Sequence, residues 1–447
     1  MGLILLSQWI HVGSANAILT ATSSQIITGN APQVVALSSA NKHGFTVNGV
    51  FYSEASGTIK SSEVKEFDGN LTLNDFKVAI YTSTNLDKVE NYSDIDGDSA
   101  DPQEPFKVES TNYWWYDNNG VRIIGNDKKK IIGCGSGFSM PLKLIIKTNV
   151  SAHSAYGIPD VGKQITLAKT YQIAPKSQIC YAKPNSTIVH PEYQWIGVDL
   201  KTDEYYFNRP EYANRHPLVG GGYTKDYVPN YGFKAQPIVS SNTFPTTGFP
   251  GAKFQLVMTG AQDDYHYQVI NNPGGGVAID QNGVVKLNSK PSGTVTVRVT
   301  LKRDNSVIHD YRFNPTSIWG VPKNFRGSFN AVQQHCGGLK NMMSRAQLTN
   351  SPRYEGQGAE LTGLSNSYTR VIGGSILGEW GWTTKSSYPD SEWQEYYAPP
   401  DFTSRYWTSD SSVIEGVQLQ YVVHNHDGFT STFTTEAPWL GYAICKG

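Results

Sequence analysis

Two histidines and an aspartate occur close together near the end of the chain, in the stretch His424-Asn425-His426-Asp427-Gly428. Imidazole nitrogens and carboxylate oxygens are ligands of Zn²⁺. On a β-strand, side chains at positions i and i+2 face the same side, so both imidazoles could hold one metal ion. No further ligand accompanies them at a diagnostic spacing, so the sequence does not assign a metal or catalytic role to this stretch.

A second group of possible metal ligands is acidic. Calcium requires several oxygen ligands at close range, and the stretch "SDIDGDSAD" offers four carboxylates, those of Asp94, Asp96, Asp98 and Asp101. An EF-hand needs Gly at its sixth position and Glu at its twelfth. Ser99 and Pro105 stand there instead, so only a calcium loop of another kind remains as an expectation. The alternative is an acidic turn exposed to solvent.

Motifs of nucleophilic or metal-dependent enzymes are absent from the sequence. There is no G-x-S-x-G, H-E-x-x-H or P-loop pattern. Ser375, in "GGSILGE", has no assignable base. The sequence therefore predicts a protein that is not an enzyme and that has no cofactor other than calcium.

Length and composition limit the class of protein. The chain has 447 residues, 17% of them charged, with a formal net charge of −1. Several domains are expected at this length, and no basic surface for nucleic acid is indicated. No apolar run reaches the roughly 18 residues of a membrane helix, so we expect no transmembrane segment.

The N-terminus resembles a secretory signal peptide. Leu3 to Val12 is a short apolar stretch, and Ala15-Asn16-Ala17 is a small-x-small cleavage signature. We therefore expect residues 1–17 to be removed on export. No Lys or Arg precedes the apolar stretch, so an ordinary N-terminal segment is the alternative.

The sequence predicts a mainly β protein with several domains. Strand-like segments and turn signals such as Asn48-Gly49 fill residues 18–243, which we expect to form one β-rich domain. Regularly spaced strands follow in residues 244–318, with a hairpin turn at Asn282-Gly283. Their order resembles a bacterial immunoglobulin-like (Ig-like) β-sandwich.

Residues 319–447 differ in composition and are expected to form a third, α+β domain. The best helix candidate in the chain lies here, with Ser328 as its cap and Gly337-Gly338 as a break. Six of the ten tryptophans lie in this part, separated by Gly, Ser and Tyr. Long irregular loops are therefore expected.

The four cysteines are Cys134, Cys180, Cys336 and Cys445. An even number in an exported chain favours disulfides, and four cysteines allow three pairings. Cys336 lies on the helix candidate and Cys445 on the probable last strand. A bond between them would tie the last strand to the first helix of the domain, where a chain end otherwise frays.

That arrangement resembles the C-type lectin-like fold, in which an early helix is joined by a disulfide to the final strand. The matching stretches are "QQHCGGLKNMM", "GEWGW", "YWTSD" and the ending "GYAICKG". An Ig-like module directly before such a domain resembles the tip of intimin and invasin adhesins. This resemblance covers about residues 244–447.

The first half resembles an uncharacterised enterobacterial adhesin domain that accompanies intimin-like tips in secreted proteins. The stretches that carry this resemblance are "ITGNAP", "GFSMPLKL", "YGIP" and "CYAKPN". The resemblance implies a Cys134–Cys180 bond inside one domain, and the family implies the outer surface of a Gram-negative bacterium or its medium. It also implies a separate outer-membrane β-barrel as a secretion partner.

The intimin and invasin resemblance implies an extracellular adhesin or secreted recognition protein that binds a host or cell-surface protein or glycan through its lectin-like tip. Calcium-dependent sugar binding is not expected, because "SYPDSEW" and "WTSD" do not complete the lectin motif. Aromatic side chains dominate protein–protein hot spots, so the aromatic-rich loop from Trp380 to Tyr406 is the expected receptor-binding segment, with Tyr388 to Tyr406 as its best part. Its candidate anchors are Tyr388, Trp393, Tyr396, Tyr397 and Arg405. A secreted enzyme acting on glycans or proteins, and a released modulator of virulence that is not an adhesin, are the alternatives.

Overall fold

The structure is a computed structural model, and it describes residues 28–189, 195–199, 204–207, 221–351, 367–395, 404–414, 416–435 and 440–447. The expected signal peptide, residues 1–17, lies outside the described residues. The chain divides into two compact units, which comprise residues 1–59, 78–113 and 145–169, and residues 60–77, 114–144 and 170–447. Within the described part, every helix is too short or too polar to cross a membrane.

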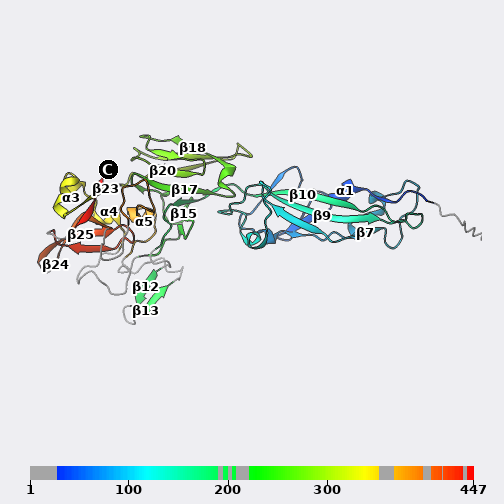
Figure 1. The fold of residues 1–447 in the computed structure, drawn as a ribbon, viewed down its shortest axis with the longest axis horizontal. Coiled ribbons are helices and arrows are strands. Elements are labelled where there is room, and N and C mark those ends of the chain that lie inside the picture. The colour runs from blue at the N-terminus through cyan, green and yellow to red at the C-terminus, as the bar shows by residue number, and fades with distance from the viewer. Residues whose placement is uncertain are drawn as a thin grey trace, which may run out of the picture. The chain divides into compact units, whose positions relative to one another are not determined.

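The first 175 residues contain short strands and two long ones, β9 (Leu142–Ala152) and β10 (Ile165–Pro175), which lie side by side in one sheet (Figure 1). The other strands are β1 (Gln33–Val34), β2 (Gly44–Val47), β3 (Val50–Ser53), β4 (Val64–Phe67), β5 (Lys77–Val78), β6 (Tyr92–Ser93), β7 (Phe106–Val108) and β8 (Asn112–Tyr116). The helices are α1 (Ala36–Ala40), α2 (Lys88–Asn91) and the 3-10 turns η1 (Leu73–Asp75), η2 (Ser83–Asn85) and η3 (Gly125–Lys129).

The turn signals of this half act as expected. Asn48 and Gly49 both have positive φ, of 48° and 80°, and join β2 to β3 in a two-residue hairpin. The core of the first unit packs side chains of β7, β9 and β10 against those of the short segments around them. Its buried residues are Val34, Tyr81, Leu86, Phe106, Val150, Ala152 and Leu167.

A β-sandwich follows in the second unit. One sheet has the order β14-β15-β11-β17-β20-β19, and the other has the order β18-β21-β22. Alternate side chains of the central strands point into the core between them, as in other sandwiches. The strands are β11 (Ile179–Pro184), β14 (Tyr227–Val228), β15 (Gly232–Lys234), β17 (Ala252–Met258), β18 (Tyr265–Asn271), β19 (Val277–Ile279), β20 (Val284–Leu287), β21 (Val295–Leu301) and β22 (Ile308–Phe313), with the 3-10 turn η4 (Gln262–Asp264).

Strand pairing in this sandwich crosses residue 244, where the sequence predicts a boundary. β11, which lies before that residue, pairs with β17 after it, and β14 and β15 extend the same sheet. The segment between 244 and 249 is buried throughout. The division at residues 243/244 and 318/319 therefore stays a prediction, and the sandwich also uses strands from residues 179–234.

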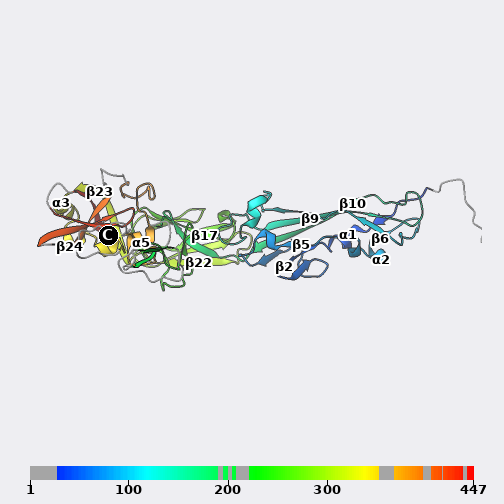
Figure 2. The ribbon, with the colours of Figure 1, turned by 90° about the horizontal axis from the view of Figure 1, so that it is seen from below.

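The C-terminal part, here called the tip, is built on a sheet with the order β16-β23-β27-β24-β25-β26. Helix α3 contacts β23 and β27 of this sheet (Figure 2). The strands are β16 (Thr247–Gly248), β23 (Ile318–Gly327), β24 (Arg405–Ile414), β25 (Val417–His424), β26 (Thr430–Phe433) and β27 (Gly441–Lys446). The helices are α3 (Phe329–His335), α4 (Arg345–Leu348), α5 (Ile376–Trp380) and the 3-10 turn η5 (Leu339–Asn341). A two-stranded sheet, β12 (Trp195–Asp199) with β13 (Glu204–Phe207), completes the described strands.

The predicted helix over residues 328–348 begins at its predicted cap and breaks at the predicted glycines, and its remainder forms η5 and α4. The Ser328 hydroxyl accepts a hydrogen bond from the Ala331 N–H, which caps α3. Gly337 and Gly338 have φ of 73° and 112°, so the chain leaves the helix there. Cys336, directly after α3, is bonded to Cys445 on β27, and Cys134 is bonded to Cys180. These are the two expected pairs.

A buried carboxylate joins the sandwich to the tip within the second unit. Glu379 on α5 is fully buried and accepts hydrogen bonds from the N–H and hydroxyl groups of Thr246 and Thr247, at 2.7 to 3.0 Å. The Gly373 N–H donates to it as well, at 2.8 Å. Beside it, Phe244 packs on Trp380, with ring centroids 4.9 Å apart. The segment that follows Phe244 is thereby fixed to the tip.

Removing the terminal disulfide should destabilise the second unit strongly. The Cys336–Cys445 bond closes a separation of 109 residues, and the loop-entropy estimate for that length is about 4.8 kcal/mol. We expect the Cys336→Ser/Cys445→Ser variant to lose roughly this free energy of unfolding in urea titrations. The matched variant Cys134→Ser/Cys180→Ser, which opens a separation of 46 residues, should lose about 4.0 kcal/mol. A loss below about 1 kcal/mol in the first variant would show that β27 does not depend on the bond.

Candidate functional site

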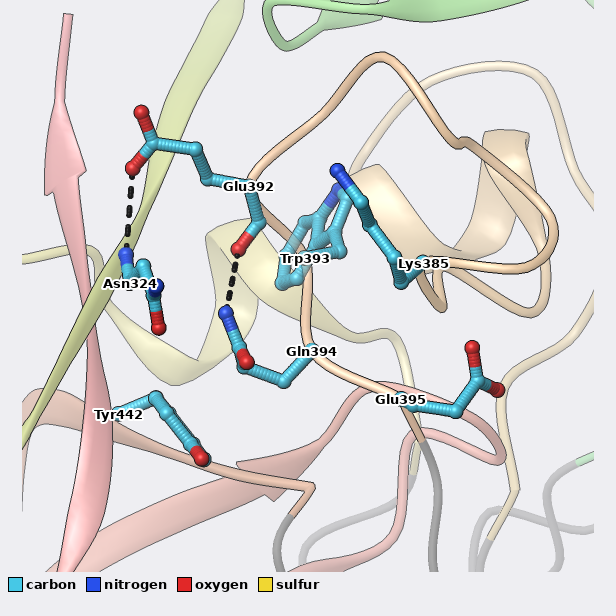
Figure 3. Close-up of a pocket in the computed structure, with 7 residues that line it drawn as sticks. All are labelled: Asn324, Lys385, Glu392, Trp393, Gln394, Glu395 and Tyr442. Atoms are coloured by element: carbon cyan, nitrogen blue, oxygen red, sulfur yellow. Dashed lines mark hydrogen bonds between the residues drawn. The ribbon is translucent and has the colours of Figure 1, made fainter.

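The tip carries a polar pocket of about 300 Å³ on its surface. Three segments that are distant in the sequence line it: β23, the stretch 385–395 and β27 (Figure 3). Its lining residues are Asn324, Lys385, Glu392, Trp393, Gln394, Glu395 and Tyr442. This tip pocket therefore combines amide, ammonium and carboxylate groups with two aromatic rings, a composition suited to hydrogen bonding and to stacking.

Hydrogen bonds hold the lining side chains in place. The Asn324 N–H donates to the Glu392 carboxylate at 3.1 Å, and Gln394 Nε2 donates to the Glu392 carbonyl at 3.0 Å (Figure 3). Glu395 accepts from the N–H and hydroxyl of Ser386, at 2.8 and 3.0 Å. The polar groups of the pocket are thus positioned before any ligand arrives, which reduces the entropy cost of binding.

The stretch 385–395 is also fastened to the sandwich by charge. The Asp390 carboxylate lies 2.6 Å from Lys253 Nζ on β17 and 2.8 Å from Lys286 Nζ on β20. Hydrogen bonds and charge from these two lysines lower the pKa of Asp390 to about 2. Gly251, with φ of 88°, lets the backbone approach closely, since a Cβ there would lie 2.5 Å from the Asp390 backbone.

Two of the expected receptor anchors are core residues, which corrects the sequence-based assignment. Tyr388 is 0% exposed and Trp393 is 1% exposed. Tyr388 donates from its hydroxyl to the Trp380 carbonyl at 2.7 Å, and its ring meets that of Phe249. Trp393 packs between Phe249 and Tyr406 and contributes only a wall to the tip pocket. Their rings stabilise the fold, so neither is an exposed anchor.

The other expected anchors divide into two groups. Tyr396 and Tyr397 lie outside the described residues. Arg405, on β24, is partly buried, and its guanidinium carbon lies 4.8 Å from the centre of the Phe433 ring. Burial lowers the pKa of Arg405. Arg405 therefore makes a contact inside the tip. Its role in receptor binding stays a prediction.

Three of the four carboxylates in the predicted calcium loop lie close together. Carboxylate oxygens of Asp94, Asp96 and Asp98 lie within 4.8 Å of one another. Asp94 Oδ1 accepts from the N–H groups of Asp96 and Asp98, and hydrogen bonds from the backbone and side chain of Asn30 lower the pKa of Asp96. Asp101 instead accepts from the N–H groups of Gln103 and Glu104 in the next turn. Calcium binding stays a prediction.

The histidine stretch is brought together more closely than the sequence indicates. His424 is the last residue of β25, and His426 and Asp427 lie in the turn to β26. One nitrogen of each imidazole and one carboxylate oxygen lie within 4.8 Å of one another. His424 and His426 are buried, at 7% and 9% residue exposure, and the Asp427 side chain is 27% exposed, so these groups converge at the hairpin turn.

Sequence reasoning missed most of the tip pocket. Lys385, Glu392, Gln394 and Glu395 fall in the aromatic-rich loop that the sequence singled out, but the chosen anchors were four aromatic residues and Arg405. Asn324 lies on β23 and Tyr442 on β27, and these two strands pair with each other in the sheet. Nothing in the local sequence signals this juxtaposition. The charged residues that lie beside Trp393 in the sequence were the local signal that could have indicated a polar binding surface.

Comparison with known families identifies part of the second unit. Residues 227–313 match the family described as invasin, domain 4. The matched range begins at β14 and ends with β22, so it covers most of the sandwich. The match confirms the intimin and invasin resemblance, which the sequence placed on an Ig-like module in this region. Comparison with curated proteins finds no match.

The solved structures to which this chain is similar include invasin, a bacterial integrin-binding protein, at 15% identity and a TM-score of 0.36 over 76% of this chain. This chain spans 58% of that structure. An intimin mutant from EHEC O157:H7 is 16% identical, with a TM-score of 0.31 over 50% of this chain and 94% of that one. A C-terminal 282-residue intimin fragment, in complex with the intimin-binding domain of the translocated intimin receptor, is 15% identical, with a TM-score of 0.31 over 67% and 75% of the two chains.

The ion pairs of Asp390 should make stability depend on pH in the acid range. The pKa of Asp390 is about 2 in the folded chain, below its ordinary value of 3.8. The contribution is therefore present above about pH 4 and is lost as the pH falls toward 2. We expect Asp390→Asn to lower the melting temperature at pH 7 and to have a much smaller effect at pH 2.5. In a Lys253→Met/Lys286→Met background the same substitution should change little at either pH. An equal effect of Asp390→Asn at both pH values would contradict this account.

Proposed function

We propose that the chain, with its invasin domain 4 match over residues 227–313, is an extracellular recognition protein of the adhesin type. It binds a host or other cell-surface receptor through its tip. The observation that carries this proposal is the tip pocket, a polar and aromatic hollow on a scaffold closed by a disulfide. The sandwich serves as the rigid support that presents it.

The charges of the pocket favour a polar ligand. Asn324, Lys385 and Glu392 are exposed, and Tyr442 is partly exposed beside them. Such a surface can accept and donate hydrogen bonds while Tyr442 supplies apolar contact area. Tyrosine and tryptophan give large contact area at low entropy cost, and of the two rings in the pocket Tyr442 is the one that a ligand can reach. We therefore assign the main contact to Tyr442.

The secreted enzyme and the released modulator remain rival functions. An enzyme would need a reactive group in reach of a substrate, whereas the converging imidazoles of His424 and His426 are buried. The pocket residues hold no nucleophile paired with a base. Recognition is therefore the function that we propose, and an adhesin is distinguished from a released modulator by whether the chain binds cells.

Truncation of Tyr442 should weaken attachment to cells. If Tyr442 is a hot spot, Tyr442→Ala should cost about 2 kcal/mol or more, roughly thirtyfold in affinity. Binding of the fluorescently labelled full chain to cultured epithelial cells, measured by flow cytometry over a concentration series, gives the affinity. The matched control is Tyr113→Ala, which removes an exposed tyrosine of the first unit and should leave binding unchanged.

Two results would contradict this assignment. Unchanged binding by Tyr442→Ala, at an unchanged melting temperature, would exclude the tip pocket as the main contact. Loss of binding in EGTA, with Tyr442→Ala still active, would point to the acidic group of Asp94, Asp96 and Asp98 instead. If the wild-type chain binds no cells at any concentration, the released modulator becomes the better description.

A further inference from the structure

We infer that His424, His426 and Asp427 form a binding site for a divalent transition-metal ion of the zinc class. This inference does not rest on the proposed receptor binding. Two imidazole nitrogens and a carboxylate oxygen lie within 4.8 Å of one another. Two imidazoles with one carboxylate are a ligand set of zinc sites that keep a fourth position open. Imidazole ligands select Zn²⁺ and its neighbours over Ca²⁺ or Mg²⁺.

The surroundings of His424 suit a ligand of a metal cation. His424 Nε2 is buried and makes no hydrogen bond, although its side chain is 7% exposed. A buried nitrogen without a partner is costly, and coordination would satisfy it.

The second imidazole already faces the carboxylate. His426 Nε2 lies 3.3 Å from Asp427 Oδ2, close enough for both atoms to bind one metal ion. The Asp427 carboxylate therefore presents this oxygen to the imidazole. Its other oxygen, Oδ1, accepts from the Phe429 N–H at 2.9 Å, which fixes its orientation.

The surrounding backbone holds this turn rigidly. Asn425, between the two histidines, donates from Nδ2 to the carbonyls of Thr383 and Gln394, both at 2.9 Å. The Tyr368 N–H donates to the Asp427 carbonyl. Gly428 has φ of 75°, and a Cβ there would lie 2.6 Å from Thr349 Oγ1. Ligands held by such a frame need little rearrangement to bind a metal.

One neighbouring side chain, the positively charged Arg405, disfavours a cation at this site. Arg405 lies directly across from His424 in the β24–β25 pair, and its charge contributes to the lowered pKa of His424. Its guanidinium carbon, however, lies 4.8 Å from the centre of the Phe433 ring, which attracts that charge. Within the site, the carboxylate of Asp427 is the group that can offset this charge.

Zinc titration of the metal-free full chain tests this inference. Competition against a chromophoric zinc chelator should give one tight site per chain. His424→Gln and His426→Gln should each weaken it by more than about a hundredfold, because loss of outer-shell partners alone costs roughly 10- to 100-fold. Cobalt in place of zinc should give visible d–d absorption that both variants lose. His266→Gln, which removes an exposed histidine on β18, is the matched control and should bind as the wild type does.

The remaining outcomes are equally decisive. Zinc binding that survives both histidine substitutions, or that is lost in Asp94→Asn or His266→Gln, would overturn the proposed site. If a histidine variant fails to fold, as judged by its melting transition without metal, Asp427→Asn replaces it. Undiminished zinc and cobalt binding by a folded Asp427→Asn variant would also overturn the proposal.

Discussion

The architecture of the second unit depends on the buried carboxylate of Glu379. It accepts hydrogen bonds from Thr246, Thr247 and Gly373, and it stands one residue before Trp380, whose indole donates to the Thr247 carbonyl at 3.2 Å. Burial raises the pKa of Glu379, whereas the hydrogen bonds from the threonines lower it. A buried carboxyl group is costly unless it is hydrogen-bonded, and these donors satisfy it, so the segment after Phe244 and helix α5 must keep their relative position.

The hydrogen bonds that Glu379 accepts from Thr246, Thr247 and Gly373, here called the clamp, determine how the tip can function. The aromatic core continues from the sandwich into the tip through Phe244, Phe249 and Trp380. Tyr388 and Trp393 belong to the same core, and the polar lining of the tip pocket alternates with them along the stretch 385–395. The lysines that pair with Asp390 hold that stretch from the sandwich side. Recognition would therefore take place on a surface whose backbone is fixed before binding, and not on a freely moving loop.

Local rules account for what the sequence predicts correctly. The Asn48-Gly49 turn, the Ser328 cap and the glycine pair after α3 follow from backbone preferences of single residues, and the cysteine pairs follow from the family resemblance. The tip pocket depends on the register between β23 and β27, and Glu379 gives no local sign that it is buried. Tyr388 and Trp393 were misassigned because an aromatic residue has the same local signal in a core as on a binding surface. Only the packing around Phe249 separates the two cases.

Amide hydrogen exchange of the full chain tests the clamp most directly. The N–H groups of Thr246 and Thr247 donate to Glu379, so the account predicts that both exchange as slowly as the central amides of β17. In Glu379→Gln, which replaces one acceptor oxygen with an amide group that donates, both should exchange much faster. Exchange of both amides at the rate of an open loop in the wild-type chain, while β17 and β23 stay protected, would contradict the claim that the sandwich and the tip form one rigid body.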